Sequence, residues 1–158
     1  MKRLLSRHKI VIAIILMVPM MLFSQKRGIR LQNITIDDGL STSNIKTLAQ
    51  DYRGYMWFGT SDGLNRYDGH EIKIYKYDPD DLASISNNVI KCTLEDEFNR
   101  LWVGTEAGGL NVLDMKAETF SRIQLPRKDA GDASPLQIWD IKAISKTKIV
   151  ISTWDGVY

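Results

Sequence analysis

The sequence predicts an all-β fold built from repeated sheets, and three observations support this prediction. Sequence text recurs at a spacing of 45 residues, so that Asp51 matches Asp96 and Trp57 matches Trp102. Within the repeats, apolar and polar residues alternate as they do in half-buried strands. No long helical stripe appears after residue 25. A repeat of about 40–50 residues is typical of the four-stranded blade of a β-propeller, so the predicted architecture is a partial propeller.

The second copy of the repeat predicts its strands most clearly. Residues 89–95 alternate as VIKCTLE, and EFNR then supplies a turn. The next run, LWVGT at 101–105, is rich in β-branched and aromatic residues, which favour strands. A glycine turn leads into LNVLD at 110–114, and FSRIQL at 120–125 completes four strands.

A third, weaker copy follows as IWDIKAIS and KIVISTWDGVY, with Thr153 and Gly156 in the roles of Thr105 and Gly108. Because propellers close with four to eight blades, we expect the 158 residues to be part of a longer protein. The predicted segments are a signal peptide at 1–24, a lead-in strand at 25–41 that closes the ring, complete four-stranded blades at 42–87 and 88–134, and part of a third blade at 135–158.

The N-terminus is typical of an export signal. A basic stretch, MKRLLSRHK, precedes an apolar run at 10–23 and then polar SQKR. As a helix this run rises only about 21 Å, short of the roughly 30 Å hydrocarbon core. We expect a signal helix cleaved after Ser24, with an uncleaved anchor as the alternative. Everything after Gln25 is then exported, to the periplasmic face of the inner membrane.

The charge of the body argues against nucleic-acid binding. The formal net charge is +2, but the first 24 residues hold four basic residues and no acidic one, which leaves −2 for the rest. Nucleic-acid binding depends on clustered positive charge.

The inventory of reactive side chains predicts no enzyme in this part of the protein. His70 is the one histidine beyond the signal segment, and Cys92 is the one cysteine. They cannot supply a multi-histidine zinc site or a disulfide framework. Cys92 lies in an alternating strand and is expected to be a small buried apolar residue. We expect no catalytic, cofactor-binding or metal-binding residues.

The stretch WFGTSDGLNRYDG at 57–69 is rich in glycine and aspartate, as phosphate-binding and calcium-binding loops are, but it fits neither pattern. A phosphate loop needs G-x-x-x-x-G-K-[ST] before a helix, whereas this loop enters a strand. A calcium loop needs acidic residues at alternate positions before its glycine, and two of the three are missing. The acidic run Asp78, Asp80 and Asp81 is interpreted as a solvated loop between blades rather than a weak calcium site.

The four tryptophans divide into two groups. Trp57 and Trp102 occupy the same place in successive repeats, which indicates packing between blades. Trp139 and Trp154 break the repeat, because the other copies hold Ser61 and Glu106 where Trp154 stands. Trp139 and Trp154 are therefore the candidate ligand-binding residues.

The repeats DGLSTSNIKTLAQDYRGYMWFGTSDGLNRYDG and ISNNVIKCTLEDEFNRLWVGTEAGGLNVLD resemble the two-component regulator propeller repeat. The resemblance covers residues 31–158 and departs locally: Asn99 replaces a turn glycine, and the third copy has VIST in place of W-x-G-T. The residues of the structural repeat motif are Asp51, Trp57, Gly59, Thr60, Gly63, Leu64 and Asn65, then Asp96, Trp102, Gly104, Thr105, Gly108, Leu110 and Asn111.

This resemblance implies the periplasmic sensor of a transmembrane regulator. Such sensors usually continue into further propeller blades, a β-sandwich, a membrane helix and a cytoplasmic output such as a histidine kinase. The implied partners are an oligosaccharide ligand, the remaining blades and a second sensor subunit. The protein is expected to contact the membrane only through the signal segment or a downstream transmembrane helix. The resemblance implies no cofactor. The alternative is a stand-alone secreted propeller that acts as a binding protein or a polysaccharide-active enzyme.

Overall fold

A computed structural model describes residues 31–126 and 136–158. The chain divides into two units, Met1–Asn33 and Ile34–Tyr158, and all the sheets lie in the second. The predicted signal peptide falls outside the described residues. Among the residues that are described, no helix is long and apolar enough to cross a membrane.

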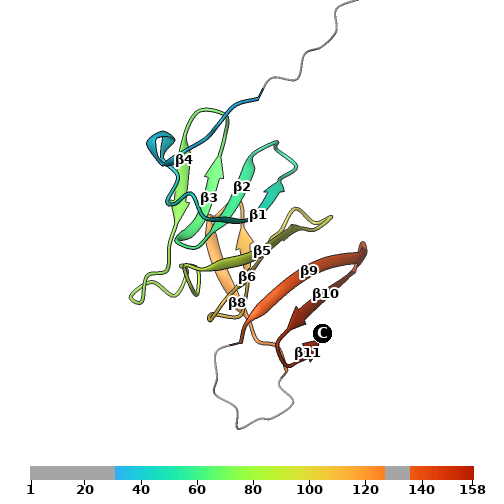
Figure 1. Ribbon diagram of the computed structural model, residues 1–158. Coiled ribbons are helices and arrows are strands. Elements are labelled where there is room, and N and C mark those ends of the chain that lie inside the picture. Colours follow the sequence, from blue (N-terminus) through green and yellow to red (C-terminus); the bar gives the residue numbers. More distant parts are fainter. Residues whose placement is uncertain (1–30, 127–135) are drawn as a thin grey trace, which may run out of the picture. The chain divides into compact units, whose positions relative to one another are not determined.

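The first blade is a four-stranded antiparallel sheet whose strands follow chain order (Figure 1). Its strands are β1 (Ile45–Gln50), β2 (Met56–Thr60), β3 (Gly63–Tyr67) and β4 (Ile72–Tyr75). Ser61 and Asp62 form the turn between β2 and β3, and Gly63 then takes φ +114°, a left-handed conformation that glycine adopts without steric cost.

The second blade repeats this arrangement, and the third forms three strands. Blade 2 consists of β5 (Ile90–Glu95), β6 (Leu101–Thr105), β7 (Leu110–Asp114) and β8 (Thr119–Ile123). Blade 3 consists of β9 (Ile138–Ser145), β10 (Lys148–Thr153) and β11 (Gly156–Val157). The predicted all-β fold, with two complete four-stranded blades and part of a third, is confirmed. The first strands lie side by side, β1 against β5 and β5 against β9.

The predicted lead-in strand is wrong for the described residues 31–41. That segment contains no strand and instead forms a short 3-10 helix, η1 (Ile36–Asp38). The Asp38 carboxylate accepts hydrogen bonds from the Thr35 backbone N–H at 2.8 Å and from its hydroxyl at 3.0 Å. These local bonds stabilise a turn, whereas a strand needs a neighbouring ladder to satisfy its backbone groups.

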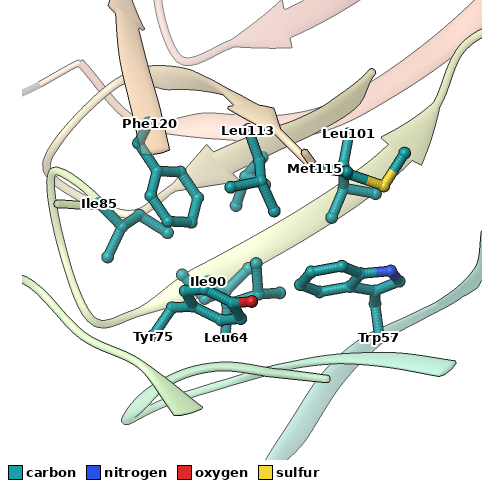
Figure 2. Packing of buried hydrophobic residues seen from close by; sticks show 10 residues of the cluster. Trp57, Leu64, Tyr75, Ile85, Ile90, Leu101, Leu113, Met115 and Phe120 are labelled. Atoms are coloured by element: carbon teal, nitrogen blue, oxygen red, sulfur yellow. The ribbon is translucent and has the colours of Figure 1, made fainter. Parts of the chain in front are cut away.

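Blades 1 and 2 share one apolar core (Figure 2). Trp57 lies in it with no exposed surface, and its ring centroid is 5.7 Å from that of Tyr75. The cluster is contributed by both blades and by the loop between them: Trp57, Leu64, Tyr75, Ile85, Ile90, Leu101, Val103, Leu113, Met115 and Phe120, of which all but Val103 are labelled in Figure 2.

Two glycines allow successive blades to approach this closely. A Cβ added at Gly59 would meet Ile90 Cγ2 at 2.7 Å, and one at Gly104 would meet Ile138 Cγ2 at 2.6 Å. In both places the glycine of one blade packs on the first residue of the next blade's first strand. The repeated glycine is therefore a site of close contact between blades.

Candidate functional site

The aspartate and the tryptophan of each repeat are bonded to each other. Asp51 accepts a hydrogen bond from the Trp57 indole N–H at 3.0 Å, and Asp96 accepts one from Trp102 at 2.8 Å. The other oxygen of Asp51 accepts the backbone N–H groups of Arg53 and Tyr55. Asp96 accepts the corresponding N–H groups of Phe98 and Arg100. Each aspartate thus holds the turn between the first two strands of its blade.

Burial works to raise the pKa of both carboxyls, but the hydrogen bonds they accept outweigh it. The pKa of Asp51 is lowered by the bonds from Trp57, Tyr55 and Arg53. The pKa of Asp96 is lowered in the same way, with the Trp102 bond as the largest lowering contribution. Both carboxylates are therefore ionised and fully engaged, as expected of groups that hold a turn in place.

A second network holds the other end of each blade. The Thr60 hydroxyl donates to the Gly63 carbonyl at 2.8 Å, and Asn65 accepts the Ser41 backbone N–H at 2.9 Å while donating to its hydroxyl at 2.8 Å. In blade 2, Thr105 donates to the Gly109 carbonyl at 2.9 Å. In the same blade the Asn111 side chain accepts the Ser86 backbone N–H and donates to the Ser86 hydroxyl, as Asn65 does with Ser41.

This network corrects one sequence assignment and adds two residues. The Thr153 hydroxyl donates to the Gly156 carbonyl, so Gly109, not Gly108, is the counterpart of Gly63 and Gly156. Ser41 and Ser86 were not among the predicted motif residues. Their separation by 45 residues, the spacing of the motif itself, is the signal that identifies them.

Each first strand carries a β-bulge at the same place. In blade 1, Ile45 pairs with Thr60 and Thr47 with Gly59, which leaves Lys46 outside the ladder. The equivalent extra residue is Lys91 in blade 2 and Trp139 in blade 3. Bulges are often found beside binding sites, where they re-aim one side chain. In each blade the bulge therefore re-aims one side chain, which lies beside the turn between the second and third strands.

Both candidate tryptophans lie at this end of blade 3. Ile138 pairs with Thr153; Trp139 follows the first of these residues and Trp154 follows the second. Their side chains are open to solvent, with exposed fractions of 49% and 58%. In blade 2 the two corresponding residues are Lys91 and Glu106, whose side chains meet at 3.3 Å. The same register places the backbone positions of Trp139 and Trp154 next to each other at the end of blade 3.

The corresponding residues of blade 2 both contact blade 3. The Lys91 ammonium lies 4.8 Å from the centroid of the Trp139 ring. Gln137, which precedes β9, donates to Glu106 at 3.4 Å. Lys91, Glu106, Gln137, Trp139 and Trp154 form what we call the bulge site, which combines exposed aromatic surface with hydrogen-bonding groups.

A cleft lies at the other end of blades 2 and 3. It has a volume of about 290 Å³ and is lined by Phe98, Arg100, Trp102, Lys146 and Ile149 among others. The Arg100 side chain already lies over the rings of Phe98 and Trp102, 5.2 Å from each, and bonds Asp96. This cleft is the rival location for a ligand.

The remaining residues of interest have local roles. Cys92 is buried, as expected, and burial raises the pKa of its thiol to about 12. His70 is exposed in the turn before β4. Asp78 and Asp81 cap their own loop by accepting the backbone N–H groups of Asp80 and Ala83. Within residues 31–126 and 136–158, no group of three or more His, Cys, Asp or Glu is gathered that would hold a metal ion.

Comparisons with known proteins agree with the repeat. The family model described as "Two component regulator propeller" matches residues 39–62 and 84–107. Histidine kinase P4 of Formosa agariphila is 44% identical over 63 residues, which are 40% of this chain and 5% of that protein.

Solved structures extend the likeness to most of the fold. The extracellular domain of a hybrid two component system from B. thetaiotaomicron matches 84% of this chain, with a TM-score of 0.63 and 26% identity. A second structure of that domain, titled as a one component system, matches 80% with a TM-score of 0.62 and 25% identity. The chain spans 18% and 16% of the length of these domains. Residues 39–62 and 84–107 of this chain thus match the two component regulator propeller repeat.

Proposed function

We propose that this chain is part of the extracytoplasmic sensor region of a two-component signalling protein, and that it binds an oligosaccharide. The relatives support the first half of the proposal, because they are a histidine kinase and extracellular domains of two-component systems. The chain itself holds propeller repeats, which support a role in recognition.

The observation that carries the oligosaccharide is the pair of exposed indoles at the end of blade 3. Sugar rings present apolar C–H faces that stack on aromatic rings, while their hydroxyls need donors and acceptors nearby. Trp139 and Trp154 supply the rings, and Glu106 and Gln137 supply polar groups beside them.

Signalling adds one requirement. A ligand shifts the equilibrium between two arrangements of a sensor only if it binds one of them more tightly. The bulge site spans two blades through the contact of Lys91 with Trp139, so a ligand held there bonds groups of both blades at once. We expect export through the N-terminal signal segment and transmission across the membrane through the rest of the protein.

The test is a calorimetric titration of the purified protein with a panel of oligosaccharides, repeated with Trp139→Ala and Trp154→Ala. Loss of one stacking ring is expected to weaken binding about 10- to 100-fold. Phe98→Ala is the matched control, since it removes an exposed aromatic ring from the rival cleft. Loss of binding in the control alone would place the ligand in the cleft. Release of reducing sugar by the protein would favour the alternative, a polysaccharide-active enzyme.

A further inference from the structure

The bulge site has a charge pattern that distinguishes between classes of oligosaccharide. Lys91 and Glu106 form an ion pair at 3.3 Å, so together they present no net charge. Asp140 and Asp155 follow the two indoles in the sequence, but their carboxylates have partners elsewhere: Asp140 is paired with Lys142 at 3.4 Å, and Asp155 accepts hydrogen bonds from Thr153 and Tyr158. The bulge site itself therefore holds one carboxylate and one ammonium group, and these two are paired with each other.

We infer that the bulge site takes a neutral oligosaccharide and that the Lys91–Glu106 pair selects it by bonding the hydroxyls of the unit next to the stacked ring. This inference rests on the proposed function and names the ligand class and two specificity-determining residues. A uronic or sulfated sugar would bring its anion beside the Glu106 carboxylate, which already pairs with Lys91, and like charges in a partly desolvated site disfavour binding.

The pair has unused bonding capacity for such hydroxyls. An ammonium group has three N–H donors, and Lys91 gives one to Glu106 Oε1. The same carboxylate oxygen also accepts from Gln137, which leaves Oε2 as a free acceptor within the described contacts. A donor and an acceptor held side by side match the adjacent hydroxyls of a sugar ring. Hydrogen bonds to charged groups are stronger than those between neutral groups.

Lys91 also fixes the stacking surface. Its ammonium lies 4.8 Å from the centroid of the Trp139 ring, close enough for a cation–π interaction. Glu106 in turn holds the ammonium in place. The lysine therefore lies over one face of the indole, and the 49% of Trp139 that stays exposed is the surface proposed for stacking a sugar.

The experiment measures dissociation constants by calorimetry for neutral oligosaccharides (gluco-, xylo-, manno- and galacto-series) and for oligogalacturonates and sulfated galacto-oligosaccharides. We compare the unmodified protein with Lys91→Met, Glu106→Gln and Lys46→Met. Lys46 occupies the same bulge in blade 1, and in the part of the chain that the structure describes it makes no recorded contact with either indole. Circular dichroism checks that each variant is folded.

We expect a neutral series to bind, Lys91→Met and Glu106→Gln to weaken it about 10- to 100-fold, and Lys46→Met to change it less than about twofold. Tighter binding of the uronic or sulfated series would overturn the inference. So would binding that needs Trp139 and Trp154 but is unchanged in Lys91→Met and Glu106→Gln, and in that case the proposed function would stand. If no oligosaccharide of either kind bound, the proposed function itself would fail.

Discussion

Replacement of Asp51 by asparagine tests how the repeat motif stabilises a blade. Asparagine keeps one oxygen for the backbone N–H groups of Arg53 and Tyr55, which the aspartate accepts at 2.9 and 3.0 Å. It turns an NH₂ group toward the Trp57 indole N–H, which then has no acceptor. Trp57 has no exposed surface, so water cannot replace the lost partner.

The magnitude follows from that burial. A buried donor without a partner costs about 1–3 kcal/mol, and hydrogen bonds to a charged group are worth about 1.5–3 kcal/mol. The salt bridge of Asp51 with the partly exposed Arg53 adds little. We therefore expect Asp51→Asn to lower the free energy of unfolding by about 2–4 kcal/mol.

Asp96→Asn is the matched comparison. It breaks the same bond in blade 2, but Trp102 is only half-buried, so water can more readily replace the lost partner and the expected cost is about 1–2 kcal/mol. The measurement is urea unfolding followed by far-UV circular dichroism, with the slopes compared between variants. Equal costs, or a larger cost for Asp96→Asn, would refute the argument from indole burial. Trp57→Phe removes the donor, so in that background Asp51→Asn should cost about 1–2 kcal/mol less.

Three further predictions concern packing and titration. Gly104→Ala should lower the free energy of unfolding by about 1–3 kcal/mol, because its Cβ meets Cys92 Sγ at 2.5 Å; Cys92→Ala should recover part of this in urea unfolding. The pKa of Glu118 is lowered to about 2 by its bonds to Lys73 and Arg66, so its contribution to stability is present above about pH 4.5 and is lost as the pH falls toward 2. Glu118→Gln should flatten that part of a plot of unfolding midpoint against pH. Because the pKa of Cys92 is raised to about 12, a disulfide reagent at pH 8 should label it in urea but not in the native protein.

The sequence was sufficient to predict the blades because every repeat carries its own turn chemistry. Asn99 illustrates this. It stands where the other repeat has Gly54, and both residues adopt positive φ, 58° and 89°. Asparagine is one of the few residues besides glycine that tolerate that conformation, so the departure from the motif keeps the same turn.

The lead-in segment shows where pattern alone fails. Alternation in IRLQNITI favours a strand, yet a strand also needs a partner that is not encoded within those residues. In the structure, the bonds from Thr35 to Asp38 produce a turn instead. Its predicted role in closing a ring stays a prediction.

The bulges could not be predicted either, for a different physical reason. In β1 the side chains alternate between half-buried and exposed through the bulge, so the sequence IKTLAQ reads as an uninterrupted strand. The extra residue appears only in the pairing, where Ile45 and Thr47 oppose the consecutive residues Thr60 and Gly59. A register shift is a property of two strands, and the periodicity of one strand does not record it.

The bulges also explain how one scaffold can carry different recognition groups. The flanking pair is isoleucine and threonine in all three blades: Ile45–Thr60, Ile90–Thr105 and Ile138–Thr153. In blades 2 and 3 the isoleucine packs on the glycine of the preceding blade, and in all three blades the threonine bonds the turn, so these residues are fixed by the fold. The two residues that follow this pair differ from blade to blade. They are Lys46 and Ser61 in blade 1, Lys91 and Glu106 in blade 2, and Trp139 and Trp154 in blade 3. Because the bulge removes one of these from the ladder and the turn exposes the other, neither is constrained by packing. Ligand chemistry can therefore vary at these positions while the blade stays the same.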